Sequence, residues 1–311
     1  MDMVLTLLNQ VIMMFLLVAV GYLMFRSGKI SPEGSKTLGN LLIWLSLPCV
    51  IINGFLIERT PEHMMGLLYS AAAAAVILAL SILISRLAFP RDAIAAFAGA
   101  FANPGFFGTP LIIATLGSKA VFYVTPFIAF LNVLQWTYGV SIMTQEGEKK
   151  QKKLSELISV GKLLKAPFVI AILIGLFFFL TGLPMPEIAK KCISSISALN
   201  TPLAMFTIGV YLADTDIRTM LTKASLYKVA MIRLLLIPAA ALAVLSLLPG
   251  ELQEMKLAIF IVAACPVGSN VAVYAQLHGK NYAYAVETVL ISTVLCVVTI
   301  PCLAYLAMLL F

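Results

Sequence analysis

The chain has 311 residues, of which 61% are hydrophobic and only 11% are charged, and its formal net charge is +7. Its mean hydropathy is +1.03. Soluble globular domains carry about 25% charged residues, so this composition excludes an ordinary water-soluble protein. The basic residues lie between apolar stretches and are interpreted as determinants of membrane topology, so we expect no nucleic-acid partner. The composition predicts an all-α membrane protein surrounded by membrane lipid.

Apolar stretches of about 20 residues, the length of a helix that crosses a bilayer, recur along the whole chain. In chain order they predict ten transmembrane helices, at residues 5–25, 37–57, 64–88, 93–116, 119–143, 165–183, 190–212, 226–248, 255–277 and 283–310. A short basic loop over residues 144–164 separates two halves. We therefore expect a first five-helix repeat over residues 1–143 and a second over residues 165–311.

Lysine and arginine are divided unevenly between the two sides of this arrangement. Sixteen of the 21 basic residues fall on the side that contains the central loop, and five fall on the other side. Cytoplasmic loops of membrane proteins carry the excess of Lys and Arg. We therefore expect a multi-pass protein of the cytoplasmic (inner or plasma) membrane, with both termini outside.

The fourth span of each half contains a cluster of helix-disrupting residues around one proline, Pro104 in the first half and Pro266 in the second. Because each half has an odd number of spans, the second copy must be inverted, an architecture common among secondary transporters. Proline removes a backbone donor, and the freed backbone groups survive in a membrane only inside protein or beside a wet cavity. Simple proline kinks are the alternative; we favour broken fourth and ninth helices.

Two broken helices would present half-helix N-termini, whose partial positive charge suits a carboxylate or another anion. Neither segment contains Lys or Arg, so helix dipoles and amides would have to hold the charge. Two amides in span five either face the substrate or form interhelical hydrogen bonds. We expect no catalytic residue, metal ligand or cofactor. The predicted substrate-binding residues are Asn103, Pro104, Gly105, Gly108, Thr109, Pro266, Gly268, Ser269, Asn270, Asn132 and Gln135.

Other classes of protein fit the sequence less well. Asp214 and Asp216 follow span seven and, two residues apart at a helix end, indicate a helix cap rather than a catalytic dyad, so we do not expect an enzyme. Nothing resembles the selectivity filter of a channel. Ionisable residues inside spans are usually functional, but Arg233 and Glu287 are expected to anchor their spans at the cytoplasmic interface. The coupling ion, a proton or sodium, stays open.

Several groups of residues resemble the auxin efflux carrier family, in particular its bacterial malate and malonate permeases. The resemblance extends over nearly the whole chain, and its most specific parts are the two Pro-centred clusters. The groups are Gly21-Tyr22 with Lys29-Ile30, Asn40 with Leu47-Pro48, residues 103–111, residues 266–270 with 273–275, and residues 291–293 with 299–301.

The resemblance implies ten helices in a scaffold and a transport subdomain, with the two broken helices crossing at their prolines as in bile-acid symporters and NhaA-like carriers. It also implies an elevator-type alternating-access mechanism and a homodimer. The short central loop and the apolar third span depart from the plant carriers, so a small mono- or dicarboxylate, malate or malonate, is favoured over an auxin-like carboxylate. The alternative is a sodium-coupled organic anion symporter of the bile-acid type, although neither broken span contains Asp or Glu.

Overall fold

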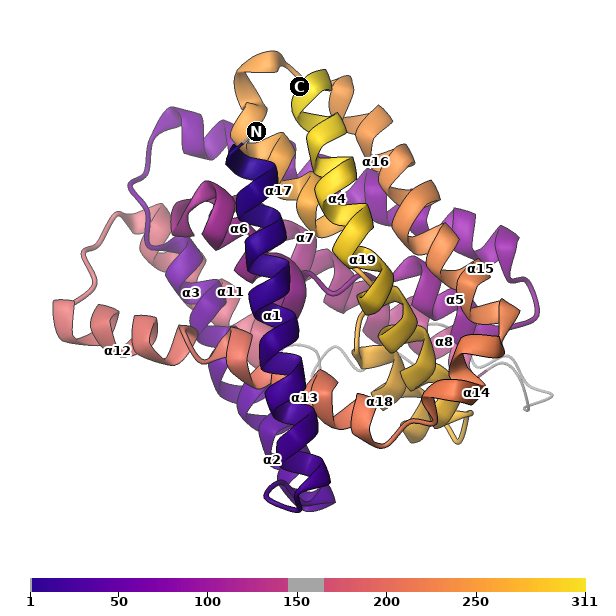
Figure 1. Cartoon of the computed structure of the whole chain (residues 1–311). Helices are drawn as coiled ribbons and strands as arrows, with labels where there is room; N and C mark the ends of the chain where they lie inside the picture. The colour runs from indigo at the N-terminus through magenta and orange to yellow at the C-terminus, as the bar shows by residue number, and fades with distance from the viewer. Residues whose placement is uncertain (1, 145–164) are drawn as a thin grey trace.

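The computed structural model describes residues 2–144 and 165–311, and in these ranges every regular element is helical (Figure 1). All of the predicted basic loop except Thr144 lies outside the described residues. Within them, seven helical stretches are long and apolar enough to cross a membrane, which confirms an all-α membrane protein. The seven are Val4–Arg26, Pro32–Phe55, Pro61–Ala88, Ser118–Thr144, Glu187–Ala213, Ala224–Ser246 and Tyr282–Leu310.

Residues 2–144, the described part of the first half, form eight α-helices and short π-helical or 3-10 segments that join them. Segments of π-helix are rare and are often found at functional sites. In chain order the elements are α1 (Asp2–Arg26), α2 (Pro32–Leu41), η1 (Leu42–Ser46), α3 (Leu47–Phe55), α4 (Pro61–Ala88), α5 (Ala93–Ala100), η2 (Pro104–Gly108), α6 (Thr109–Leu116), η3 (Ser118–Ala120), α7 (Val121–Leu134), η4 (Gln135–Gly139) and α8 (Val140–Thr144).

The second half begins again after the central segment and ends in the longest helix of the described chain. Its elements are α11 (Pro167–Thr181), α12 (Glu187–Ser197), α13 (Asn200–Ala213), α14 (Ile217–Thr222), α15 (Ala224–Met231), η5 (Ile232–Leu236), α16 (Ile237–Ser246), η6 (Gly250–Leu252), α17 (Gln253–Ala263), α18 (Asn270–Leu277) and α19 (Tyr282–Leu310).

Side-chain caps explain several of the helix starts. The Asp92 carboxylate accepts a hydrogen bond from Ala95 N over 2.9 Å at the start of α5. The Asp216 carboxylate accepts from the backbone N–H groups of Arg218 and Thr219 at the start of α14. Such caps satisfy backbone donors that have no partner inside the helix. The predicted capping role is therefore confirmed for Asp216.

By their main contacts the helices form two bundles, which meet where α1 packs on α19 and α3 packs on α7. In the first, which we call the α1–α13 bundle, α1 lies along α13, and α3 packs on α11 and α12. In the second, the α4–α19 bundle, α4 packs on α5, α7 and α16, and α19 packs on α15 and α18. In Figure 1, α3, α11 and α12 lie to the left, and α5, α15 and α16 lie to the right.

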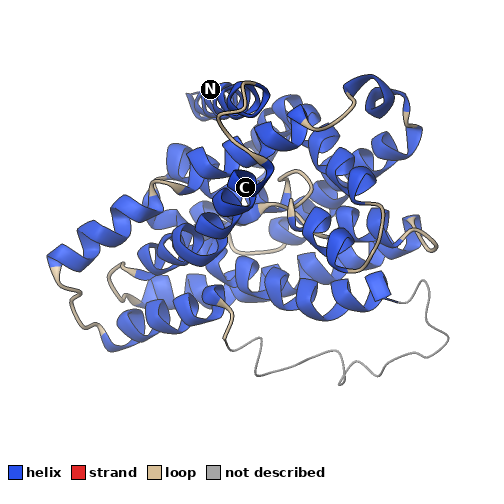
Figure 2. Ribbon diagram, turned by 90° about the horizontal axis from the view of Figure 1, so that it is seen from below, coloured by secondary structure: helices blue, strands red, loops and turns tan. Residues whose placement is uncertain are grey.

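Both predicted interruptions are present. Predicted span 93–116 consists of α5 and the helix η2–α6, separated by irregular backbone at residues 101–103. Predicted span 255–277 consists of α17 and α18, separated at residues 264–269. Figure 2 shows such loop segments in the interior of the helical body. The count of ten spans and the inverted repeat stay predictions, because the halves of these two spans and α11 are each shorter than the seven long stretches.

Candidate functional site

The two interruptions lie against each other as short antiparallel segments. Ala102 and Val267 form an isolated antiparallel bridge. Beside it, Asn103 N donates a hydrogen bond to the carbonyl oxygen of Pro266 over 3.0 Å. A backbone donor or acceptor left without a partner in an apolar environment costs several kcal/mol. The pairing of one interruption with the other removes that cost.

Gly268 makes the close approach of the two segments possible. Its backbone N–H donates to the Phe101 carbonyl over 2.9 Å, and a Cβ on Gly268 would lie 2.5 Å from the backbone oxygen of Ala102. A third contact comes from α19, where the Ser292 hydroxyl oxygen accepts a hydrogen bond from Val267 N over 3.0 Å. Buried hydrogen bonds therefore hold the second interruption both to the first interruption and to α19.

A small cavity of about 30 Å³ opens at the crossing, between the starts of η2 and α18 and the side of α7. A space of this size holds one or two water molecules. Leu47 of α3 closes it from the α1–α13 bundle. Seven of the predicted substrate-binding residues line this cavity, namely Asn103, Pro104, Gly105, Asn132, Gly268, Ser269 and Asn270.

The amide of Asn103 is oriented by the helix that follows it. Its Oδ1 accepts a hydrogen bond from Phe106 N over 3.3 Å and so caps η2. The Nδ2 group is therefore the end of this amide that can donate to a ligand in the cavity. Asn132 has the opposite arrangement, because its Nδ2 donates to the Ile128 carbonyl of its own helix over 2.8 Å. Asn132 thus offers the cavity its carbonyl oxygen as an acceptor and the second N–H of its Nδ2 as a donor.

The predicted amide Gln135 takes part in an interhelical hydrogen bond. Its Oε1 accepts from Asn270 Nδ2 over 2.9 Å and so ties η4 to the start of α18. Of the two alternatives left open for the span-five amides, Gln135 follows the interhelical one. Its Nε2 is buried and has no hydrogen-bond partner among the described residues.

The remaining predicted residues support the crossing from outside the small cavity. Pro266 contributes the carbonyl that pairs with the opposite segment. The Thr109 hydroxyl donates to the Pro104 carbonyl over 3.1 Å, inside the same helix. Gly108 lets η2 pack on α17, since a Cβ there would lie 2.8 Å from the Val262 side chain. These residues are structural neighbours of the site, and Thr109 also lines a second cavity.

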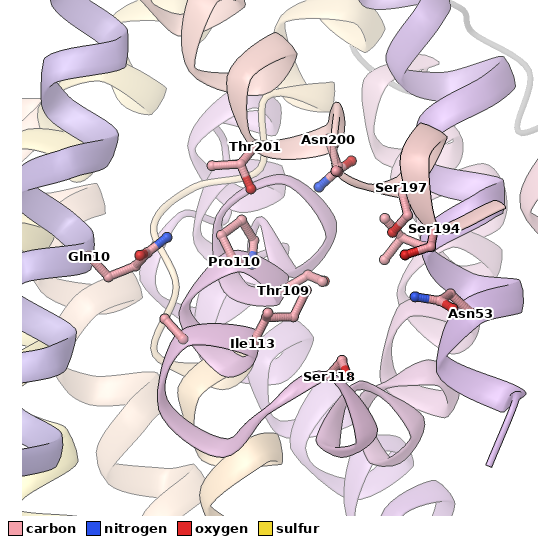
Figure 3. A pocket seen from close by; sticks show the side chains of 13 residues that line it. Gln10, Asn53, Thr109, Pro110, Ile113, Ser118, Ser194, Ser197, Asn200 and Thr201 are labelled. Atoms are coloured by element: carbon pink, nitrogen blue, oxygen red, sulfur yellow. The ribbon is translucent and has the colours of Figure 1, made fainter. Parts of the chain in front are cut away.

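The second cavity has a volume of about 420 Å³ and lies between α6 and four helices of the α1–α13 bundle, namely α1, α3, α12 and α13 (Figure 3). Its lining is rich in uncharged polar groups, and it contains neither an acidic nor a basic side chain. Amides and hydroxyls of this kind can donate hydrogen bonds to a carboxylate. The polar side chains that line it are Gln10, Asn53, Thr109, Ser118, Ser194, Ser197, Asn200 and Thr201.

Asn200 connects the larger cavity to the crossing. It lines the cavity, and its Nδ2 donates to the Gly105 carbonyl of η2 over 2.8 Å. The Asn200 Oδ1 is buried and lacks a hydrogen-bond partner in the part of the chain that the structure describes. Sequence reasoning did not include Asn200 in the site, although its place before Thr201-Pro202 inside an apolar span was a usable signal.

The interface position expected for Arg233 is wrong. Its side chain is only 1% exposed, and its guanidinium donates to backbone carbonyls of Gly99, Ala100 and Ala263 at the two interruptions. Polar partners inside the protein replace the lipid headgroups that an interface anchor would meet.

The second ionisable residue inside a span, Glu287, is also buried, and its carboxylate accepts hydrogen bonds from Lys223 Nζ over 2.6 and 2.7 Å.

The sequence matches the pattern of the membrane transport protein family over residues 6–304. The chain belongs to this family. The resemblance to the auxin efflux carriers, which are part of it, is thereby confirmed. A Rhizobium meliloti (strain 1021) protein named "Putative malonate transporter" is 26% identical over 301 residues, covering 94% of this chain and 93% of that protein. The molecule is a membrane transport protein with several membrane-crossing helices.

Proposed function

We propose that this protein is a secondary carrier that moves a small mono- or dicarboxylate across the cytoplasmic membrane, with the anion bound at the crossing. The observation that carries the proposal is the small cavity at the paired interruptions. It is lined by the first residues of two helices and by neutral amides, and its lining contains no acidic side chain. Such a cavity offers an anion hydrogen-bond donors without charge repulsion.

The helix dipoles at the crossing favour negative charge. The helix η2–α6 begins at Pro104 and α18 begins at Asn270, and both residues line the same cavity. The N-terminus of a helix carries about half a positive charge. Two such ends side by side suit one carboxylate group and repel a cation. The malonate in the name of the Rhizobium meliloti relative is a substrate of this class.

The larger cavity supports an alternating-access mechanism. The small cavity is too small for malonate in this conformation, so the crossing must open for the anion to bind there. The cavity beside it, of about 420 Å³ between α6 and the α1–α13 bundle, gives the anion a place to enter. In the proposed cycle the anion enters this chamber, and a movement of one bundle relative to the other carries it across, as in an elevator. The proposal includes ten transmembrane helices in two inverted repeats, coupling to a proton or sodium ion, a homodimer, and both termini outside.

The amides at the crossing provide a direct test. Uptake of radiolabelled malonate or malate is measured in proteoliposomes for the wild-type protein, for Asn103→Ala and for Asn270→Ala. Removal of a donor from a carboxylate costs roughly 1.5–3 kcal/mol, so uptake at low substrate concentration is expected to fall about tenfold or more. Asn9→Ala, at an exposed position of α1, is the matched control and is expected to transport normally. Uptake at the wild-type rate in both crossing variants would show that the anion does not bind at this site.

A further inference from the structure

Arg233 lies at the interruptions although it belongs to a different span. It is part of η5, a π-helical segment in the middle of the stretch Ala224–Ser246. Its Nη1 donates to the carbonyls of Gly99 and Ala100 over 3.4 Å each, and its Nη2 donates to the carbonyl of Ala263. In the described part of the chain its hydrogen-bond partners are backbone oxygens, and Nε has none.

Its three partners occupy equivalent places in the two broken spans. Gly99 and Ala100 are the last residues of α5, and Ala263 is the last residue of α17. The last four carbonyls of a helix have no partner inside it. A single guanidinium therefore caps the C-terminal ends of both half-helices.

The charges at the crossing can be counted from this arrangement. Two helix C-termini contribute about −0.5 each, and two N-termini contribute about +0.5 each, so the four ends alone sum to roughly zero. The guanidinium adds one full positive charge, because arginine stays protonated in proteins. With Arg233 in place, the C-terminal ends are neutralised and the positive N-terminal ends are left for the ligand.

We propose that Arg233 is the residue that gives the crossing its preference for anions over neutral molecules of the same shape. It is a positioning residue that acts through the two half-helices. This inference rests on the proposed function and deepens it, since it assigns the charge preference of the same site to one side chain. It also places the necessary cation in a span that contributes nothing to the lining of the small cavity.

The test compares a dicarboxylate with its uncharged analogue. Uptake of radiolabelled malonate is measured in proteoliposomes, and unlabelled malonate and malonamide are used as competitors. One unit charge acting over about 10 Å at an effective dielectric constant near 20 changes anion affinity by roughly tenfold. Arg233→Gln and Arg233→Met are therefore expected to lose about tenfold of the preference for malonate over malonamide, while Arg233→Lys keeps most of it.

The preference is a ratio measured on one protein sample, so partial loss of folded protein does not change it. Lys256→Gln is the matched control, because Lys256 is also buried but lies in the first half of α17, against the Phe311 ring at 5.3 Å. It is expected to keep the wild-type ratio. An unchanged preference for malonate over malonamide in both Arg233→Gln and Arg233→Met would overturn the inference about Arg233 and leave the proposed function standing. Failure of wild-type protein to bind any carboxylate would overturn the proposed function.

Discussion

Gly268→Ala is the smallest change that acts directly on the crossing. A Cβ at this position would lie 2.5 Å from the Ala102 backbone oxygen and 3.3 Å from the Phe101 oxygen. Ordinary contacts of this kind begin near 3.4 Å, so the two segments would have to separate by roughly 0.9 Å. Both neighbours are backbone atoms and cannot turn away as a flexible side chain would. The hydrogen bond of 2.9 Å from Gly268 N to Phe101 would be stretched or lost.

The cost has two parts. Overpacking of a well-packed interior costs about 1–3 kcal/mol, and a buried backbone pair that loses its hydrogen bond costs about 1–3 kcal/mol. Together they predict a loss of about 2–6 kcal/mol at the crossing. The loss should appear as lower thermal stability of the detergent-purified protein and as reduced carboxylate uptake in proteoliposomes.

Gly39→Ala is the matched control for this variant. Gly39 lies in α2, and a Cβ there would have no neighbour within 4 Å. Alanine is the better helix former by about 1 kcal/mol, so Gly39→Ala is expected to preserve or slightly raise stability. Stability and uptake of Gly268→Ala equal to those of Gly39→Ala would contradict this expectation.

Three further predictions concern the packing and the ion pairs. Gly209→Ala is expected to separate α13 from α1, because a Cβ there would overlap the backbone of α1. Small residues allow such close helix packing in membranes. The midpoint temperature of thermal unfolding should therefore fall. Lys223→Gln leaves the buried Glu287 carboxylate without its ion-pair partner, so a loss of about 1–3 kcal/mol is expected from thermal unfolding, and addition of Glu287→Gln should recover part of it. Hydrogen bonds from the Thr219 hydroxyl and from backbone N–H groups lower the pKa of Asp216 below its usual value. The folded-state pKa is depressed, so the stability that this cap gives α14 is present at neutral pH and lost as the pH falls through the lowered pKa. Hydrogen exchange of the α14 amides should therefore accelerate in acid. Asp216→Asn should remove this pH dependence.

The interruptions were predictable from the sequence because their cause is local. Asn103-Pro104-Gly105 and Pro266-Val267-Gly268 combine a missing donor, backbone freedom and a capping amide within a few residues. The apolar stretches were predictable for the same reason, since each long helix must cover the thickness of a bilayer. The contact between the two interruptions was implied by family resemblance, not by the periodicity of the chain.

The parts of the site that sequence reasoning missed depend on long-range contacts. Arg233 lies more than 130 residues from Gly99 in the sequence, and nothing in its own span indicates that a π-helical segment directs it to the interruptions. Asn200 reaches Gly105 across 95 residues. The larger cavity exists because α3, α6 and α13 do not fill the space between them. Tertiary packing decides each of these features.

The central claim is that the protein carries a small carboxylate, and substrate counterflow tests it most directly. Proteoliposomes that contain purified wild-type protein are loaded with unlabelled malonate, and the entry of labelled malonate is followed with and without proton or sodium gradients. The account predicts a transient accumulation of label that requires internal carboxylate and is lost in Asn103→Ala. Equal entry of label with and without internal carboxylate, or no entry through folded protein for malonate, malate or lactate, would contradict it.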